Sequence, residues 1–337
     1  MKTIFIVDDS DTNLATAELT LEDYYNVITM PSAVKMFFLL ELITPDLILL
    51  DIEMPDMNGF DALIRLKNNK WADIPVIFLT ANTDPETEVK GFKIGAVDFV
   101  KKPFSPPVLL NRIKTHLDID TIIRERMMQL MNLQNSMISV LADFVEKRDK
   151  ETGGHIERTS TYIEILINEM KSNGVYLNEI NDWDIDKIIL SAKMHDLGKI
   201  SITDDIINKP GKLTDEEFNI MKTHTLYGEE IINDIIRRTG EGEFLNYAKL
   251  FAGCHHERWD GNGYPRGLKG MDIPLQGRIM AIADVYDALV SARPYKKPFT
   301  HEDAVQIIME NADKQYDPNI CEIFFKVNNQ FKQVSAS

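Results

Sequence analysis

Histidines and carboxylates gather in the second half of the chain, in a pattern that suits a metal centre. His195 stands beside Asp196, and His255 stands beside His256. Adjacent residues on a helix point about 100° apart, so each pair suits a centre of several ions better than one chelated ion. Imidazole together with carboxylate favours iron, manganese or zinc over calcium. Two such ions about 3.5–4 Å apart can clamp a phosphodiester and lower the pKa of a bound water towards about 7.

Four further residues extend the candidate ligand set. His224 falls in a predicted helix, and Asp284 is a carboxylate within an otherwise apolar helical run. Glu151 and His155 are spaced i, i+4, although two glycines lie between them. The two histidines that we interpret as hydrogen-bonded structural residues are His116 and His301.

A second reactive set lies in the first hundred residues, where short apolar runs end in polar side chains. Asp8 and Asp9 follow the first run, Asp51 ends the third, Thr80 ends the fourth and Lys102 follows the fifth. Strands of a parallel sheet place these positions on one edge. Clustered carboxylates there suit Mg²⁺. A carboxylate beside a cation and a hydroxyl can accept a phosphoryl group.

The elements that position this second set alternate along the chain. We expect buried strands near residues 4–7, 27–30, 46–50, 74–79 and 97–100. We expect helices between and after them, near 11–23, 33–43, 58–68, 85–94 and 105–118. Strand and helix in alternation predict an α/β domain with a five-stranded parallel sheet covered on both faces.

The next stretch, from Ile113 to Phe144, is predicted to form one long helix. Steps of three and four along this helix give ten seam positions: Ile113, His116, Asp120, Ile123, Met127, Leu130, Gln134, Met137, Leu141 and Phe144. Seven of these ten residues are apolar. This spacing predicts a coiled-coil homodimer with imperfect heptads. The alternative is a helix that lies on its own domain.

From about residue 146 the pattern is all-helical. Helices are expected near 155–172, 184–197, 214–238, 243–256, 276–292 and 301–313. Thr214 and Glu217 have the spacing of a capping box. The irregular stretch from Arg258 to Pro274 contains glycines that permit close backbone approach, so we interpret it as a flexible rim. A short basic segment at 293–297 suits phosphate groups.

Composition limits the possible functions. The 337 residues predict about two domains. Lysine and arginine number 37 against 53 acids, a net charge of −16, which argues against a nucleic-acid polymer or a polybasic membrane contact. The two cysteines exclude a disulfide framework and fit a reducing cytosol. No apolar run reaches ~18 residues and the N-terminus is unlike a signal peptide, so we expect a cytoplasmic protein without membrane spans.

The motifs of the first part resemble those of response-regulator receiver domains, over about residues 1–120. They are Asp8-Asp9, Asp51 to Pro55 with Gly59, Leu79-Thr80-Ala81, and Lys102-Pro103-Phe104. The resemblance implies a flavodoxin-like fold and a sensor histidine kinase as phosphodonor. It also implies the site roles: Asp51 as phosphoacceptor, Asp9 as the main Mg²⁺ ligand with Asp8 nearby, Thr80 and Lys102 on the phosphoryl group, and Phe99 as the aromatic switch partner.

The motifs of the second part resemble the HD phosphohydrolases, and specifically their HD-GYP subfamily. They are His195 to Lys199, His255 to Gly261, Gly263-Tyr264-Pro265 and Gly267-Leu268. The resemblance implies hydrolysis of cyclic di-GMP to pGpG, and in many members to GMP, at two or three iron or manganese ions. The implied metal ligands are His155, His195, Asp196, His224, His255, His256 and Asp284, with Glu151 for a third ion.

The same resemblance implies the groups that meet the substrate. Asp196 and Lys199 would act in catalysis, Tyr264 would lie near the substrate, and Arg293 and Lys296, like Lys199, would contact its phosphates. We therefore expect a receiver domain over 1–120, a helical linker over 105–145 and an HD-GYP domain over 146–337.

The leading hypothesis is a phosphorylation-controlled cyclic di-GMP phosphodiesterase. One alternative is a catalytically silent cyclic di-GMP receptor or partner-binding regulator, which missing ligands would have favoured. Another is a general HD nucleotidase, against which the Gly263-Tyr264-Pro265 segment argues.

Overall fold

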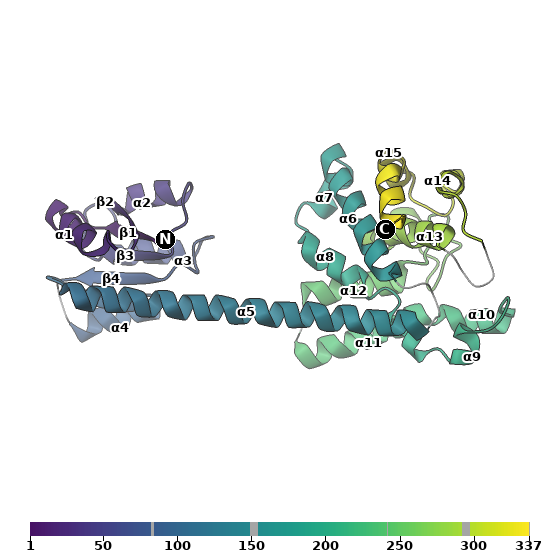
Figure 1. The fold of residues 1–337 in the computed structure, drawn as a ribbon, viewed down its shortest axis with the longest axis horizontal. Coiled ribbons are helices and arrows are strands. Elements are labelled where there is room, and N and C mark those ends of the chain that lie inside the picture. The colour runs from purple at the N-terminus through teal and green to yellow at the C-terminus, as the bar shows by residue number, and fades with distance from the viewer. Residues whose placement is uncertain (82–83, 149–153, 241, 292–296, 337) are drawn as a thin grey trace. The chain divides into compact units, whose positions relative to one another are not determined.

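The computed structural model describes residues 1–81, 84–148, 154–240, 242–291 and 297–336. The chain divides into two compact units, Met1–Leu130 and Met131–Ser337. Figure 1 labels the helices and strands of each unit.

The first unit is built on a five-stranded parallel sheet of strand order β2-β1-β3-β4-β5. The strands are β1 (Thr3–Val7), β2 (Asn26–Met30), β3 (Leu47–Asp51), β4 (Val76–Thr80) and β5 (Asp98–Lys101). Every residue of β3 and β4 is buried, as expected for central strands of a sheet covered on both faces. The predicted α/β sheet is confirmed. Asp51 and Thr80 are the last residues of their strands, which places both at the carboxyl edge.

Helices cover both faces of this sheet. They are α1 (Asp11–Leu21), α2 (Ala33–Leu40), α3 (Gly59–Lys67), α4 (Pro85–Lys93) and the start of α5 (Pro106–Arg148). One core joins the sheet to α2 and α3, and a second core joins it to α1 and α5. Ser10 caps α1 by accepting a hydrogen bond from the backbone N–H of Asn13, so the helix begins directly after the acidic pair.

Helix α5 is 43 residues long, which confirms a long helix after the sheet. Its predicted seam needs correction at the first position, because Ile113 is fully buried in the core of the first unit. The later apolar seam positions are between 52% and 65% exposed: Ile123, Met127, Leu130, Met137, Leu141 and Phe144. A neighbouring face of the same helix buries Ala142 and Val145.

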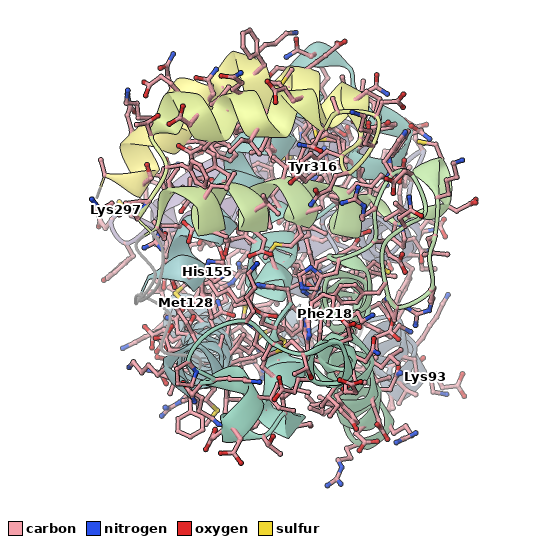
Figure 2. All side chains as sticks on the ribbon, turned by 90° about the vertical axis from the view of Figure 1, so that its right-hand side faces the viewer. Lys93, Met128, His155, Phe218, Lys297 and Tyr316 are labelled. Carbon is pink, nitrogen blue, oxygen red and sulfur yellow. The ribbon has the colours of Figure 1, made fainter. Side chains whose placement is uncertain are left out.

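The second unit, in its described part, is built from helices joined by turns and irregular segments. Its α-helices are α6 (His155–Asn173), α7 (Leu177–Ile180), α8 (Ile185–Ala192), α9 (Asp204–Ile207), α10 (Asp215–Lys222), α11 (His224–Thr239), α12 (Glu243–Cys254), α13 (Leu275–Val290), α14 (His301–Glu310) and α15 (Pro318–Ser335). Two 3₁₀ turns are η1 (Leu197–Ser201) and η2 (Gly270–Asp272). The largest core gathers α6, α8, α13, α14 and α15. Figure 2 shows His155 and Tyr316 among the packed side chains, and both are buried.

Four helix predictions in the second unit need correction. The helix expected at 301–313 ends at Glu310. The helix expected at 184–197 ends at Ala192, and the helix expected at 243–256 ends at Cys254. The helix expected at 214–238 is two helices that meet at Thr223. Side chains bind backbone carbonyls in the last turn of α10, in competition with backbone N–H groups. Thr223 Oγ1 donates to Ile220 O at 2.6 Å, and His224 Nδ1 lies 2.7 Å from Met221 O.

Three helices of the second unit were not predicted: the single-turn helices α7 and α9, and the long helix α15. Helix α15 has a clear start signal in the sequence. The Asp317 side chain caps the helix by accepting hydrogen bonds from the backbone N–H groups of Asn319 and Ile320, and Pro318 is the first helical residue. Its apolar residues at 320, 323, 324, 327 and 331 are buried at helical spacing.

Candidate metal centre and acidic site

The acidic site lies at the carboxyl edge of the sheet. Three aspartates meet here: Asp8, Asp9 and Asp51. Each contributes one carboxylate oxygen to a group of three oxygens that lie within 4.8 Å of one another. Lys102 Nζ lies 2.7 Å from Asp8 Oδ2 and 2.8 Å from Asp51 Oδ1. Asp8 and Asp51 are buried, whereas Asp9 is exposed. The residues predicted from strand ends therefore meet, and their oxygens fit one hard cation.

Burial and charge set the ionisation of this site. Burial raises the pKa of Asp51, and Lys102 offsets only part of that rise. Burial lowers the pKa of Lys102, but Asp51 and Asp8 more than reverse this, so the ammonium is retained. Asn13, which the sequence reasoning missed, donates from Nδ2 to Asp8 Oδ1 at 3.0 Å. Its position three residues after the Ser10 cap could have indicated it.

Thr80 and Phe99 lie on the neighbouring strands. Both side chains are buried. The Phe99 ring packs against Phe92 of α4, with ring centroids 5.0 Å apart. Gly91 makes room for it, because a Cβ at that position would lie 2.3 Å from Phe99 Cζ. The absence of a side chain at Gly91 therefore leaves the space that the buried Phe99 ring, the aromatic partner expected from the receiver motif, occupies.

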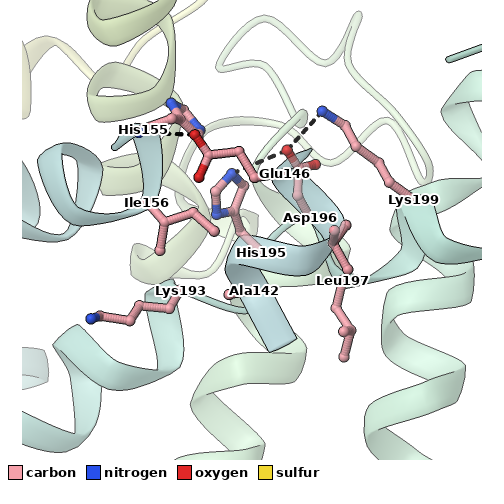
Figure 3. Close-up of a pocket in the computed structure, with 10 residues that line it drawn as sticks. Ala142, Glu146, His155, Ile156, Lys193, His195, Asp196, Leu197 and Lys199 are labelled. Carbon is pink, nitrogen blue, oxygen red and sulfur yellow. Dashed lines mark hydrogen bonds and ion pairs between the residues drawn. The ribbon is translucent and has the colours of Figure 1, made fainter. Parts of the chain in front are cut away.

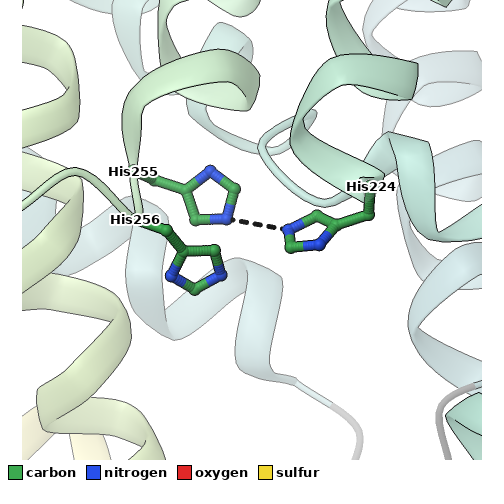
Figure 4. A group of neighbouring side chains, drawn as sticks. All are labelled: His224, His255 and His256. Atoms are coloured by element: carbon green, nitrogen blue, oxygen red, sulfur yellow. Dashed lines mark hydrogen bonds between the residues drawn. The ribbon is translucent and has the colours of Figure 1, made fainter. Parts of the chain in front are cut away.

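The second unit brings its predicted ligands together in two groups. His155, His195 and Asp196 form one, with ligand atoms within 4.8 Å of one another. Figure 3 shows this group in the wall of a cavity. A second group with the same spacing contains His224, His255 and His256, which face one another in Figure 4.

Asp196 connects the two groups. Its Oδ2 lies 3.4 Å from His195 Nε2, and its Oδ1 lies 3.4 Å from His224 Nε2. The distance from Oδ1 to His255 Nε2 is 3.7 Å. Each carboxylate oxygen therefore faces a different set of imidazoles, which is the arrangement of a bridging ligand between two ions.

Backbone carbonyls orient most of these rings. The Nδ1 atoms of His195, His224 and His255 lie 3.0 Å from Ala192 O, 2.7 Å from Met221 O and 2.9 Å from Phe251 O. A carbonyl only accepts, so each Nδ1 carries the hydrogen and each Nε2 presents its lone pair to the centre. This is the tautomer that a metal ligand needs.

Two buried atoms of the group support metal binding. Within the described residues, His195 Nε2 and Asp196 Oδ1 have no hydrogen-bond partner. Leaving buried polar atoms unsatisfied costs about 1–3 kcal/mol each, and a divalent ion would supply the missing interaction. Burial holds the pKa of His255 and of His256 well below the usual value, so both rings are neutral ligands at pH 7. The donor set fits the expected divalent ions.

Asp284 and Lys199 flank the first group. Asp284 Oδ1 of α13 lies 3.6 Å from His155 Nε2, and Lys199 Nζ of η1 lies 2.9 Å from Asp196 Oδ2. Burial raises the pKa of Asp196, but Lys199 and His195 outweigh it and hold that pKa well below its ordinary value. The carboxylate is therefore ionised.

Two glycines allow the helices to carry these groups so close together. A Cβ at Gly198 would lie 1.9 Å from His224 O, and a Cβ at Gly277 would lie 2.6 Å from Cys254 O. Any larger residue would push η1 from α11, or α13 from α12.

An open cleft of about 330 Å³ lies beside the second group. The Tyr264 ring is 4.8 Å from His256, and Phe218 meets Tyr264 edge-on with ring centroids 6.3 Å apart. Glu257 shapes the rim, since its carboxylate accepts the backbone N–H groups of Arg266 at 2.8 Å and Leu268 at 3.0 Å. The cleft combines aromatic faces with polar groups, which suits a nucleobase.

The sequence reasoning missed three buried acids around the centre. Glu257 holds the rim, Glu146 of α5 accepts the backbone N–H of His155 at 3.0 Å, and Asp287 lies 2.9 Å from His155 Nδ1. Asp287 has a signal in the sequence, because it lies one helical turn beyond Asp284 in the same apolar run.

Five further candidates from the sequence do not belong to the two described ligand groups. Glu151, Arg293 and Lys296 lie outside the described residues. His116 and His301 do not join the ligand groups: His116 Nε2 pairs with Asp98 Oδ2 at 3.0 Å, and His301 Nδ1 bonds the Tyr286 hydroxyl at 2.8 Å. Their interpretation as hydrogen-bonded structural residues is confirmed. In the described part, no helix combines the length and apolar character that crossing a bilayer requires.

Comparison with known families identifies the domain in each part of the chain. The model for the response regulator receiver domain matches residues 4–114, and the model for the HD domain matches residues 136–320. The probable cyclic di-GMP phosphodiesterase of Vibrio cholerae serotype O1 is 39% identical over 99% of this chain and 79% of that relative. The cyclic di-GMP phosphodiesterase of Thermotoga maritima is 33% identical over 98% of this chain and 92% of its own length.

A third relative carries the combination of domains in its name. The cyclic di-GMP phosphodiesterase response regulator RpfG of Xanthomonas campestris pv. campestris is 33% identical over 86% of this chain and 77% of the relative. The chain belongs to the family of response regulators that join a receiver domain to an HD domain.

Proposed function

We propose that this protein is a phosphodiesterase that hydrolyses cyclic di-GMP to pGpG under the control of its receiver domain. The observation that carries the proposal is the bridging position of Asp196 between two imidazole groups. The same centre can act on the remaining phosphodiester of pGpG, so GMP is the second product to assay. The names of the Vibrio and Thermotoga relatives support this choice of substrate.

The imidazole and carboxylate atoms of the two groups would hold two iron or manganese ions. Glu151 would be a ligand of a third ion. His155, His195 and Asp284 would hold one ion and His224, His255 and His256 the other, with Asp196 shared. When bound, such ions polarise a phosphoryl oxygen and lower the pKa of water.

The remaining roles belong to the chain's own residues. Lys199, 2.9 Å from Asp196, is close enough to offset charge on the non-bridging phosphate oxygens. Tyr264 and Phe218 line the cleft and would pack against a guanine there. Arg293 and Lys296 would hold the phosphates of the dinucleotide against a protein of net charge −16. Because they bind ground and transition states alike, their loss should mainly raise KM.

Control would begin at the acidic site of the receiver. Asp51 would accept the phosphoryl group from a histidine kinase in the cytoplasm, with Mg²⁺ held by Asp9 and Asp8. Lys102 already bridges Asp8 and Asp51 and can contact the incoming phosphoryl oxygens. Thr80 on β4 and Phe99 on β5 would change position when Asp51 is phosphorylated.

The exposed seam of α5 supports a homodimer. In its last turns the helix buries Ala142 and Val145 in its own unit, while Met137, Leu141 and Phe144 remain more than half exposed. A second copy of the helix would cover them. The domain limits we propose are those expected from the motifs: 1–120, 105–145 and 146–337.

The test is a substrate panel on metal-loaded protein. Cyclic di-GMP, pGpG and a mononucleotide phosphate ester are offered in turn, and the products are separated by chromatography. We expect cleavage of cyclic di-GMP to a product with a 5′ phosphate. Faster turnover of the mononucleotide would replace the proposal with a general HD nucleotidase.

A further inference from the structure

Asp287 is a buried carboxylate immediately behind the metal centre. It lies on α13 and is 1% exposed. Its Oδ2 lies 2.9 Å from His155 Nδ1, on the side of the ring away from Asp284, whose Oδ1 lies 3.6 Å from Nε2. Asp287 therefore contacts a candidate ligand without facing the centre itself.

This contact makes His155 different from its neighbours. Three other candidate ligands direct Nδ1 to a backbone carbonyl: His195, His224 and His255. The Nδ1 of His155 instead meets a carboxylate. An anion polarises the ring more strongly than a neutral carbonyl does, and so increases the donor strength of Nε2.

The carboxylate itself is held in place by a fork of hydrogen bonds. Arg158 Nε donates to Asp287 Oδ1 at 2.6 Å, and Arg158 Nη2 donates to Oδ2 at 2.8 Å. Ser291 Oγ donates to the same Oδ2 at 3.2 Å. The Arg158 guanidinium therefore places a permanent positive charge against both oxygens of Asp287. Such a bidentate pair fixes both position and charge.

We propose that Asp287 is a positioning residue that fixes the orientation of His155 and makes the half of the centre containing His155, His195 and Asp284 the tighter-binding half. The proposal rests on the metal centre proposed above, and not on the identity of the substrate. Removing such an outer partner costs about 10–100-fold in metal affinity. The two ions should therefore bind in two distinguishable steps.

The experiment measures metal binding to the full chain without substrate. The apoprotein is titrated with Mn²⁺, and bound ions per chain are counted at fixed free-metal concentrations. Asp287→Asn keeps the size of the side chain and removes its charge, while Ser291→Ala is the matched control that removes a neutral donor from the same oxygen. We expect Asp287→Asn to weaken the tighter step by about 10–100-fold and leave the weaker step unchanged. Ser291→Ala should leave both steps within about twofold.

A purely structural role would give a different result. In that case Asp287→Asn would lower the melting temperature of the apoprotein, and both binding steps would weaken together. Should Asp287→Asn not fold, Arg158→Lys tests the same claim, because it keeps the charge and loses the fork. We expect it to weaken the tighter step alone. Two unchanged steps in the folded variant would overturn the proposal, whatever the protein does with cyclic di-GMP.

Discussion

Asp196 is the residue on which the two halves of the metal centre depend. Its two oxygens lie 3.4 Å from the imidazoles of His195, in the turn between α8 and η1, and of His224, the first residue of α11. Lys199 keeps it ionised and can also meet the substrate. One side chain therefore lies between both imidazole groups and next to the cation that we propose for the substrate phosphates.

The first prediction concerns this residue. Asp196→Asn keeps the shape of the side chain but removes its charge, so it should weaken the shared site and lower kcat by at least about 10³-fold. Steady-state kinetics and metal analysis on the same samples check it. His301→Asn, a substitution at a histidine outside the ligand groups, is the control and should retain metal. Full metal content and normal kcat in the Asp196→Asn variant would contradict the bridging role.

The second residue-scale prediction concerns the receiver. Because Asp51 faces Asp8 and Lys102 at the sheet edge, it should be the phosphoacceptor. A small phosphodonor with Mg²⁺ should label the protein, and Asp51→Asn should abolish that label while the second unit keeps its metal. Asp23→Asn, an exposed acid elsewhere in the unit, should label normally. Equal labelling of both variants would exclude Asp51.

The elements show why close approach matters in the helical unit. Turn η1 follows Asp196 and lies against α11, where Gly198 leaves no room for a Cβ beside His224 O. The sequence showed Gly198 as part of a motif, but the motif alone could not show that the glycine sets the distance between two ligand-bearing elements. That distance depends on a tertiary contact.

Gly198→Ala tests this spacing. The added methyl should separate η1 from α11, lower the free energy of unfolding by about 1–3 kcal/mol and weaken metal binding. Gly242→Ala is the matched control, since its Cβ would meet only atoms at 3.9 Å. Denaturant unfolding and metal analysis provide the measurements. Equal stability and metal content in the two variants would show that the contact is not limiting.

Helix α5 carries the prediction about assembly. Leu130→Lys with Met137→Lys places charges in the exposed apolar seam and should weaken self-association by at least tenfold, because a dimer would bury them. Gln129→Lys with Asn132→Lys adds the same charge at positions outside the seam and should leave association unchanged. Analytical ultracentrifugation at tens of micromolar distinguishes the results. A monomeric unmutated protein would contradict the coiled-coil dimer.

The sequence anticipated much of the fold and of the site, for identifiable reasons. The runs Leu47–Leu50 and Val76–Leu79 are continuously apolar, so the sheet and its reactive edge were predictable. Adjacent pairs such as His195-Asp196 indicated a centre of several ions. The break at Thr223 was not predictable from periodicity, because side-chain hydrogen bonds compete there with the helix. The role of Asp287 needed the three-dimensional contact between α6 and α13.

At the scale of the whole molecule, the receiver and the HD domain occur in one chain, so phosphorylation at one site can control hydrolysis at the other. We predict that a small phosphodonor changes kcat/KM for cyclic di-GMP at least severalfold in the unmutated protein. The same treatment should leave Asp51→Asn unchanged, because that variant cannot accept the phosphoryl group. Parallel assays of both proteins with and without the donor check this. An equal response of both would mean that the donor acts elsewhere.

The most direct test of the central claim is turnover of cyclic di-GMP by the full chain, purified without oxygen and loaded with iron or manganese. Both the phosphorylated and the unphosphorylated forms are assayed, and binding of cyclic di-GMP is measured on the same samples. We expect at least one form of the unmutated protein to release pGpG, and the Asp196→Asn variant to release none. If cyclic di-GMP binds but neither metal-loaded form cleaves it, the protein is a receptor and the enzymatic account is wrong.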